Sequence, residues 1–170
     1  MKFTRIKKRL ALILMAAIVP ATLAGVALAT PASGAIGTIL VRAGFQEAVD
    51  LKFKVQEGKS QEVIHVTDAQ DTVMQQIVIA PGGTTGWHSH PGPAVALVKS
   101  GELTVYSSED ATCTGHTFVA GQGFVDSGQG HVHNARNLGN TPTEVWVTYF
   151  DVPPDESVRI DAPDPGICNF

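Results

Sequence analysis

The sequence predicts an all-β domain built as a sandwich or barrel. After residue 30 the chain is a series of segments of five to nine residues, rich in Val, Ile and Thr. Gly, Pro, Asn, Asp and Ser separate these segments at the short spacing typical of such folds. Residues 102–106 and 144–149 each offer one apolar and one mixed face, as a half-buried strand does. No segment carries a 3.6-residue apolar stripe over twelve residues, so long helices are not expected, and a short helix over residues 45–49 is the one alternative.

The predicted strands follow one another in close order along the chain. Each is bounded by turn-forming residues, and the turns are short enough for neighbouring strands to pair directly. After Asp151 four prolines interrupt the pattern, which predicts an irregular C-terminal strap over 151–170. The predicted strands cover residues 37–43, 51–56, 62–69, 72–80, 94–100, 102–108, 116–120, 132–137 and 143–150.

Residues 1–29 have the pattern of a secretory signal peptide. Five basic side chains precede the apolar run of residues 10–19, and the segment ends in the A-x-A sequence of residues 27–29. An uncleaved membrane anchor is the alternative, because residues 10–29 are just long enough to span a bilayer. Pro20, Gly25 and the small-residue end favour cleavage. We therefore expect a secreted, extracytoplasmic protein, with no membrane association once the signal peptide is removed.

The remaining residues, 30–170, are expected to form a single domain. The signal segment holds five of the twelve Lys and Arg residues and none of the sixteen Asp and Glu. The mature chain therefore carries seven basic and sixteen acidic side chains, a formal net charge of −9. Nucleic-acid binding requires clustered Lys and Arg, which this composition does not supply. A nucleic-acid partner is excluded.

The chain has two cysteines, Cys113 and Cys168. In an exported protein an even count predicts a disulfide, which would tie the C-terminal strap to the middle of the domain. Closing a loop of about 55 residues would stabilise the fold by roughly 4 kcal/mol. Two free thiols are the alternative. The wide spacing, without a CxxC, is a poor zinc or redox motif.

Four of the six histidines form two H-x-H pairs, His88 with His90 and His131 with His133. Residues i and i+2 of a strand point to the same face, so each pair can aim two imidazoles at one point. Imidazole is a common ligand of Zn, Fe, Ni and Cu. The alternative is that strands simply happen to carry histidines, which is what we expect of His65 and His116.

The surroundings of the first pair resemble the first motif of the cupin family, G-x5-H-x-H-x3,4-E-x6-G. Gly82, His88, His90 and Gly101 stand at the matching spacings. The position of the glutamate is occupied by Ala94, which has no ligating atom. The first pair alone therefore offers two ligands and lacks the carboxylate.

The second pair lies in a stretch similar to the second cupin motif, G-x5-P-x-G-x2-H-x3-N. Gly121, Gly130, His133 and Asn137 match it, with one extra residue before the turn and Gly128 in the proline position. The resemblance covers about residues 72–150. It implies a double-stranded β-helix, also called a jelly-roll barrel, whose metal ligands point inward.

The resemblance implies that His88, His90 and His133 bind one divalent transition metal, without distinguishing Fe, Zn, Mn and Ni. Three neutral imidazoles leave the full +2 charge on the ion and an open coordination position. His131 is the local candidate for a fourth ligand, against a role in the surroundings of the site. Asp126 is a candidate acid or base at the barrel mouth, against the alternative of a solvated loop carboxylate.

Two functions fit these features. One is an exported metal-dependent enzyme acting on a small molecule, of dioxygenase or of isomerase or lyase type. The other is a non-catalytic module that binds a small ligand or a metal. The family resemblance also makes a homodimer an expectation.

Overall fold

The computed structural model describes residues 29–57 and 60–170, and this part of the chain is built from strands and turns without a helix. The predicted all-β jelly-roll fold is confirmed. Of the predicted signal peptide, all but Ala29 lies outside the described residues. Within the described ranges, no helix is long and apolar enough to cross a membrane.

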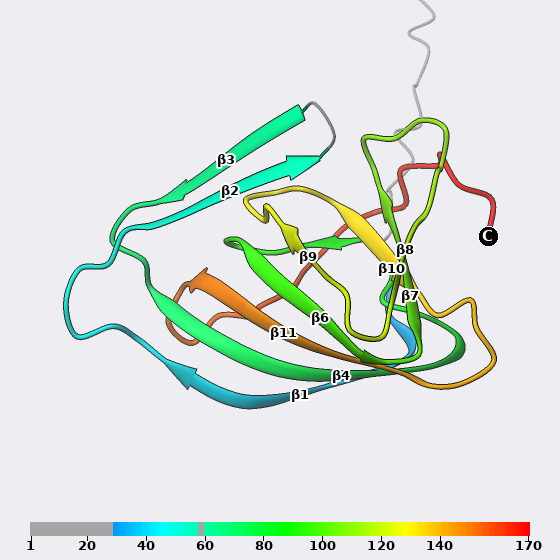
Figure 1. Ribbon diagram of the computed structural model, residues 1–170, viewed down its shortest axis with the longest axis horizontal. Coiled ribbons are helices and arrows are strands. Elements are labelled where there is room, and N and C mark those ends of the chain that lie inside the picture. Colours follow the sequence, from blue (N-terminus) through cyan, green and yellow to red (C-terminus); the bar gives the residue numbers. More distant parts are fainter. Residues whose placement is uncertain (1–28, 58–59) are drawn as a thin grey trace, which may run out of the picture.

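One large antiparallel sheet curves around the core of the protein as the jelly-roll barrel (Figure 1). On one side β1 pairs with β4, β4 with β11, β11 with β6, and β6 with β9. On the other side β12 pairs with β5, β5 with β10, β10 with β7, and β7 with β8. The strands are β1 (Ser33–Ala43), β4 (Asp71–Thr84), β5 (His88–Ser89), β6 (Ala94–Ser100), β7 (Glu102–Ser107), β8 (His116–Val119), β9 (Gly123–Asp126), β10 (His133–Arg136), β11 (Thr143–Val152) and β12 (Ile160–Asp161).

The alternation predicted for the last long strand places its apolar side chains in the barrel. Val145, Val147 and Tyr149 of β11 are buried, and β6 contributes buried Ala94 and Ala96 beside them. Trp146 and its neighbours in the alternation face outward. The small side chains of Ala94 and Ala96 on β6 therefore lie next to the larger residues of β11 with which they pair.

The strands β2 (Leu51–Glu57) and β3 (Ser60–Val66) form a separate two-stranded hairpin. It projects from one end of the barrel (Figure 1). The rings of Phe53 and Phe150 lie 5.3 Å apart and connect the hairpin to the end of β11. Ile64 and Val66 are buried, so the hairpin packs part of its length against the rest of the molecule.

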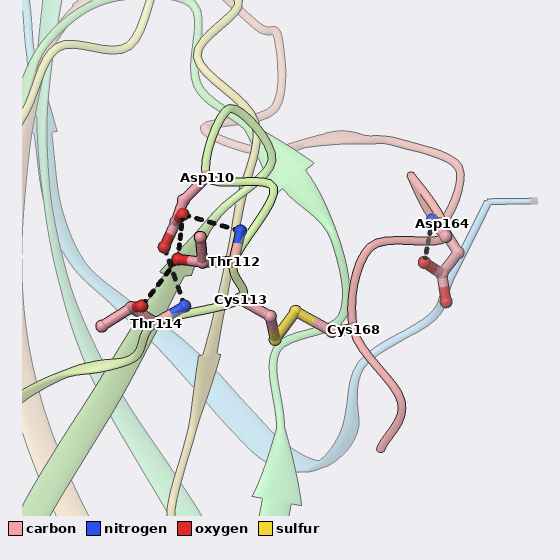
Figure 2. Close-up of a disulfide and its surroundings, with 7 residues drawn as sticks. Asp110, Thr112, Cys113, Thr114, Asp164 and Cys168 are labelled. Atoms are coloured by element: carbon pink, nitrogen blue, oxygen red, sulfur yellow. Dashed lines mark hydrogen bonds between the residues drawn. A yellow bond between two sulfur atoms is a disulfide. The ribbon is translucent and has the colours of Figure 1, made fainter.

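The C-terminal strap is fixed in two ways. Cys113, in the loop between β7 and β8, is joined to Cys168 with a Cα–Cα distance of 5.4 Å (Figure 2). The strap also contains β12, which the prediction of an irregular tail missed. Ile160 pairs with Ser89 in this strand, so the strap runs along the strand that carries the first histidine pair.

Candidate metal centre

Three histidines meet inside the barrel. His88 on β5 and His133 on β10 are direct partners across the two strands, and His90 follows β5 immediately. All three are at most 5% exposed. Their potential ligand atoms lie within 4.8 Å of one another. The two motifs recognised in the sequence therefore converge on one point, although forty-odd residues separate them along the chain.

Backbone carbonyl groups fix the orientation of the first two rings. His88 Nδ1 lies 2.9 Å from the carbonyl oxygen of Gly86, and His90 Nδ1 lies 2.6 Å from that of Val158. A carbonyl oxygen only accepts, so each Nδ1 carries the hydrogen. Nε2 is then the atom with the free lone pair, which is the arrangement found in metal-ligating histidines.

At the third ring, that of His133, a carboxylate lies beside Nδ1 in place of a backbone carbonyl group. Asp126 Oδ2 lies 3.0 Å from His133 Nδ1, within ion-pair distance but outside the angle of a good hydrogen bond. Asp126 ends β9 and is the cross-strand partner of Ala94. Although Ala94 has no carboxylate, the neighbouring strand thus places the carboxylate of Asp126 beside the His133 ring.

Asp126 also holds the loop that leads to β10. Its Oδ1 accepts a hydrogen bond of 2.8 Å from the amide of Gly128, and its Oδ2 lies 2.9 Å from His131 Nδ1. His131 Nε2 lies 3.1 Å from Ser107 Oγ. Both ring nitrogens of His131 are therefore engaged. The structure groups His131 with Asp126 and His133, apart from His88 and His90.

The protonation states follow from burial and from these contacts. Burial, with the neighbouring His133, lowers the pKa of His88 to about 2, and burial lowers that of His90 to about 4. Both rings are neutral at neutral pH. Burial opposes ionisation of Asp126, but contacts with His131 and His133 hold the pKa of its carboxyl well below the usual range. The bond to Asp126 raises the pKa of His131.

Other residues that the motifs share have structural roles. Asn137 is fully buried, and its amide donates to the carbonyl groups of Ile79 and Thr141, at 2.9 and 2.8 Å. Gly128 has a φ of +60°, and a side chain there would meet the backbone of Gly92 at 1.9 Å. The two motif loops therefore pack directly against each other. His65 and His116 are exposed and belong to neither group.

A cavity of about 450 Å³ borders His88 and His90. Its wall is formed by β1, β4, β11 and the strap. The lining combines apolar side chains with polar and charged ones. The lining residues are Ala32, Ala35, Gly37, Ile39, Arg42, Val73, Gln75, Ile77, Thr85, His88, His90, Tyr149, Glu156, Ser157, Val158 and Arg159. Such a cavity has the size and character of a small-molecule site.

The donor set fits a divalent transition metal. Three converging imidazoles, two of them with Nδ1 bonded to a carbonyl oxygen, suit Zn, Fe, Ni or Cu better than Mg or Ca. Cys113 and Cys168 are joined to each other, so no thiolate competes from that pair. Ala94 supplies no fourth ligand, and it lines a small pocket of about 40 Å³ together with all three histidines.

Comparison with known families agrees with the fold. Residues 75–153 match the model of the cupin domain. The chain therefore carries a cupin domain. This match confirms the family resemblance, and its limits agree with the span from β4 to β11 that encloses all three histidines. No curated protein sequence matches this cupin.

Solved structures with similar folds include an oxalate oxidase, at 29% identity over 48% of this chain and 42% of that one, with a TM-score of 0.42. A cupin domain from Bordetella pertussis matches at 19% identity over 72% and 97%, with a TM-score of 0.46. The polyketide cyclase RemF from Streptomyces resistomycificus matches at 15% over 54% and 60%, with a TM-score of 0.44. This cupin thus spans less than half the length of the oxalate oxidase chain.

Proposed function

We propose that this cupin is an exported enzyme that binds one divalent transition metal through Nε2 of His88, His90 and His133 and acts on a small molecule. The observation that carries the proposal is the acceptor beside each Nδ1. Gly86, Val158 and Asp126 supply these three acceptors from different parts of the chain. A histidine cluster without a metal role would not require all three rings to be turned the same way.

When bound, such an ion supplies a Lewis acid with open coordination positions for an oxygen-containing substrate. The protein controls where those positions lie. His88 and His90 line the cavity, so the free side of the ion faces it. Ala94 is only 2% exposed and adds no bulk on the opposite side, where a glutamate would otherwise fill a coordination position.

The cavity wall would contact the substrate and shield it from water. Val73, Ile77 and the ring of Tyr149 offer apolar surface beside the histidines. The Tyr149 hydroxyl donates to Gln75 Oε1 at 3.0 Å, and burial raises the pKa of Tyr149 above its ordinary value. Its phenol therefore stays protonated at neutral pH and presents a fixed polar group to a bound molecule.

The cysteine pair supports the exported location in this proposal. A disulfide between Cys113 and Cys168 persists in oxidising compartments and is rare in the cytosol. The basic and apolar segment at the start of the sequence points the same way.

Metal content tests the proposal. Protein purified without a His-tag and reconstituted with zinc is expected to hold about one ion per chain. The double variant H90A/H133A is expected to hold almost none. The matched control is H65A/H116A, which removes two exposed histidines outside the site and is expected to bind metal like the wild type. Less than about a tenth of an ion per wild-type chain would contradict the proposal.

A further inference from the structure

Arg159 is a residue of the cavity wall whose guanidinium is only partly paired. Its side chain is 24% exposed, yet Nη2 is buried and has no hydrogen-bond partner among the described residues. A buried guanidinium nitrogen without a partner is costly, and native proteins rarely leave one unsatisfied. The same side chain lines the cavity together with His88 and His90.

The strap holds Arg159 in place. Its Nε pairs with Oδ1 of Asp161, and Asp161 is the β12 partner of His88. The preceding residue, Val158, accepts the hydrogen bond of His90 through its carbonyl oxygen. The segment that orients His90 and pairs with the strand of His88 is therefore the segment that places Arg159 in the cavity wall.

The other charged residues of the cavity wall do not supply a partner for Nη2 of Arg159. Arg42 Nε lies 3.3 Å from Asp71 Oδ2, and its Nη2 donates to the carbonyl oxygen of Glu156 at 2.8 Å, so Arg42 is already paired. Glu156 itself is exposed. Arg159 is thus a cation of this wall with an unpaired hydrogen-bond donor, Nη2.

We propose that Arg159 binds the carboxylate of a small organic acid that occupies the cavity. Guanidinium and carboxylate match in plane and charge, so a carboxylate at the cavity side of Arg159 would form a charge-assisted pair with it. Part of the remaining wall is apolar, including Ala35, Ile39, Val73 and Ile77, and this part suits a hydrocarbon body. This inference deepens the proposed function and rests on it, since it names the substrate class of the same site.

Benzoate is a suitable probe, with benzamide as its uncharged equivalent. We would measure binding of both by calorimetry to zinc-loaded and to metal-free protein. In R159M the Kd for benzoate is expected to rise about 10- to 100-fold, the worth of a hydrogen bond to a charged group. K99M is the control, because Lys99 pairs with Glu144 and lies over the ring of Trp146, away from the cavity wall. It removes the same charge and should leave the Kd unchanged.

The outcomes separate the two proposals. Equal benzoate affinity in wild type and R159M, or no benzoate binding to wild type, would overturn the role of Arg159 even if zinc binds fully. Failure to take up zinc would overturn the metal site, while benzoate binding to the metal-free protein still tests Arg159. R159K retains the charge and covers the case in which R159M does not fold, with an expected affinity between those of wild type and R159M.

Discussion

The substitution D126N tests whether Asp126 supports metal binding through its contact with His133. Asparagine keeps the size of the side chain and leaves Oδ1 to accept the amide of Gly128. It replaces Oδ2, the oxygen that faces His133 Nδ1 at 3.0 Å and His131 Nδ1 at 2.9 Å, with a neutral amide group. We expect zinc binding to weaken while the fold is retained.

The magnitude follows from which of these contacts reaches the metal. The proposed ligand set does not include His131, so only the contact with His133 would bear directly on the ion. Loss of one such supporting partner costs metal affinity about 10- to 100-fold, or about 1.4–2.8 kcal/mol. The two carbonyl acceptors of His88 and His90 stay in place, which is why a complete loss of binding is not expected.

A competition titration of zinc against a chelator at neutral pH would measure the change. The matched control is D110N, because the Asp110 carboxylate also accepts several hydrogen bonds, from Thr112 and Thr114, but lies in an exposed loop beside the disulfide (Figure 2). D110N is expected to bind zinc like the wild type. A zinc Kd for D126N within a factor of about two of wild type would refute the supporting role of Asp126.

Three further predictions concern stability. Replacing Cys113 and Cys168 by serine should lower the free energy of unfolding by roughly 4 kcal/mol, and reductant should then have no further effect in thermal melts. N137A leaves two carbonyl groups without a donor and should cost about 1–3 kcal/mol in urea unfolding, whereas a change below about 0.5 kcal/mol would contradict the role given to Asn137. In metal-free protein the lowered pKa values of His88 and His90 mean that the unfolded chain takes up protons first below about pH 6.5. Stability should therefore fall between pH 7.5 and 5.5, by about 1–2 kcal/mol per histidine, and equal urea midpoints at the two pH values would count against it.

Patterns that depend on local chemistry allowed most of the fold to be predicted. Strand alternation, turn residues and the motif glycines predicted the long strands, including β4, β6, β7 and β11. The strands missed by the prediction, β5, β9 and β12, have four residues or fewer. The two-residue strands β5 and β12 exist because of their neighbours, and their own sequences carry too few alternations to indicate them.

The candidate site, like the fold, could be predicted from the sequence only in part. The spacing of His88 and His90, and the second motif around His133, placed three histidines together, and the structure brings the three into one group. The role of Asp126 depends on the register of β9 against β6, which pairs it with Ala94. Register between strands is a tertiary property, so the sequence indicated only a loop carboxylate near the barrel mouth.

Arg159 could not be predicted as a site residue at all. It stands in a proline-interrupted strap with no repeating pattern, and its relevance comes from the pairing of Asp161 with His88. Only the arrangement in space shows that the strap lines the cavity. The signal that could have pointed to it is the single Arg in the tail after Asp151, where the other charged residues are acidic.

X-ray absorption spectroscopy of the zinc-loaded, tag-free protein tests the central claim most directly. The three-histidine centre predicts about three imidazole nitrogens at roughly 2.0–2.1 Å, with oxygen in the remaining position and no sulfur. A sulfur ligand, or a spectrum fitted by a single imidazole, would contradict the assignment of His88, His90 and His133 to one metal ion.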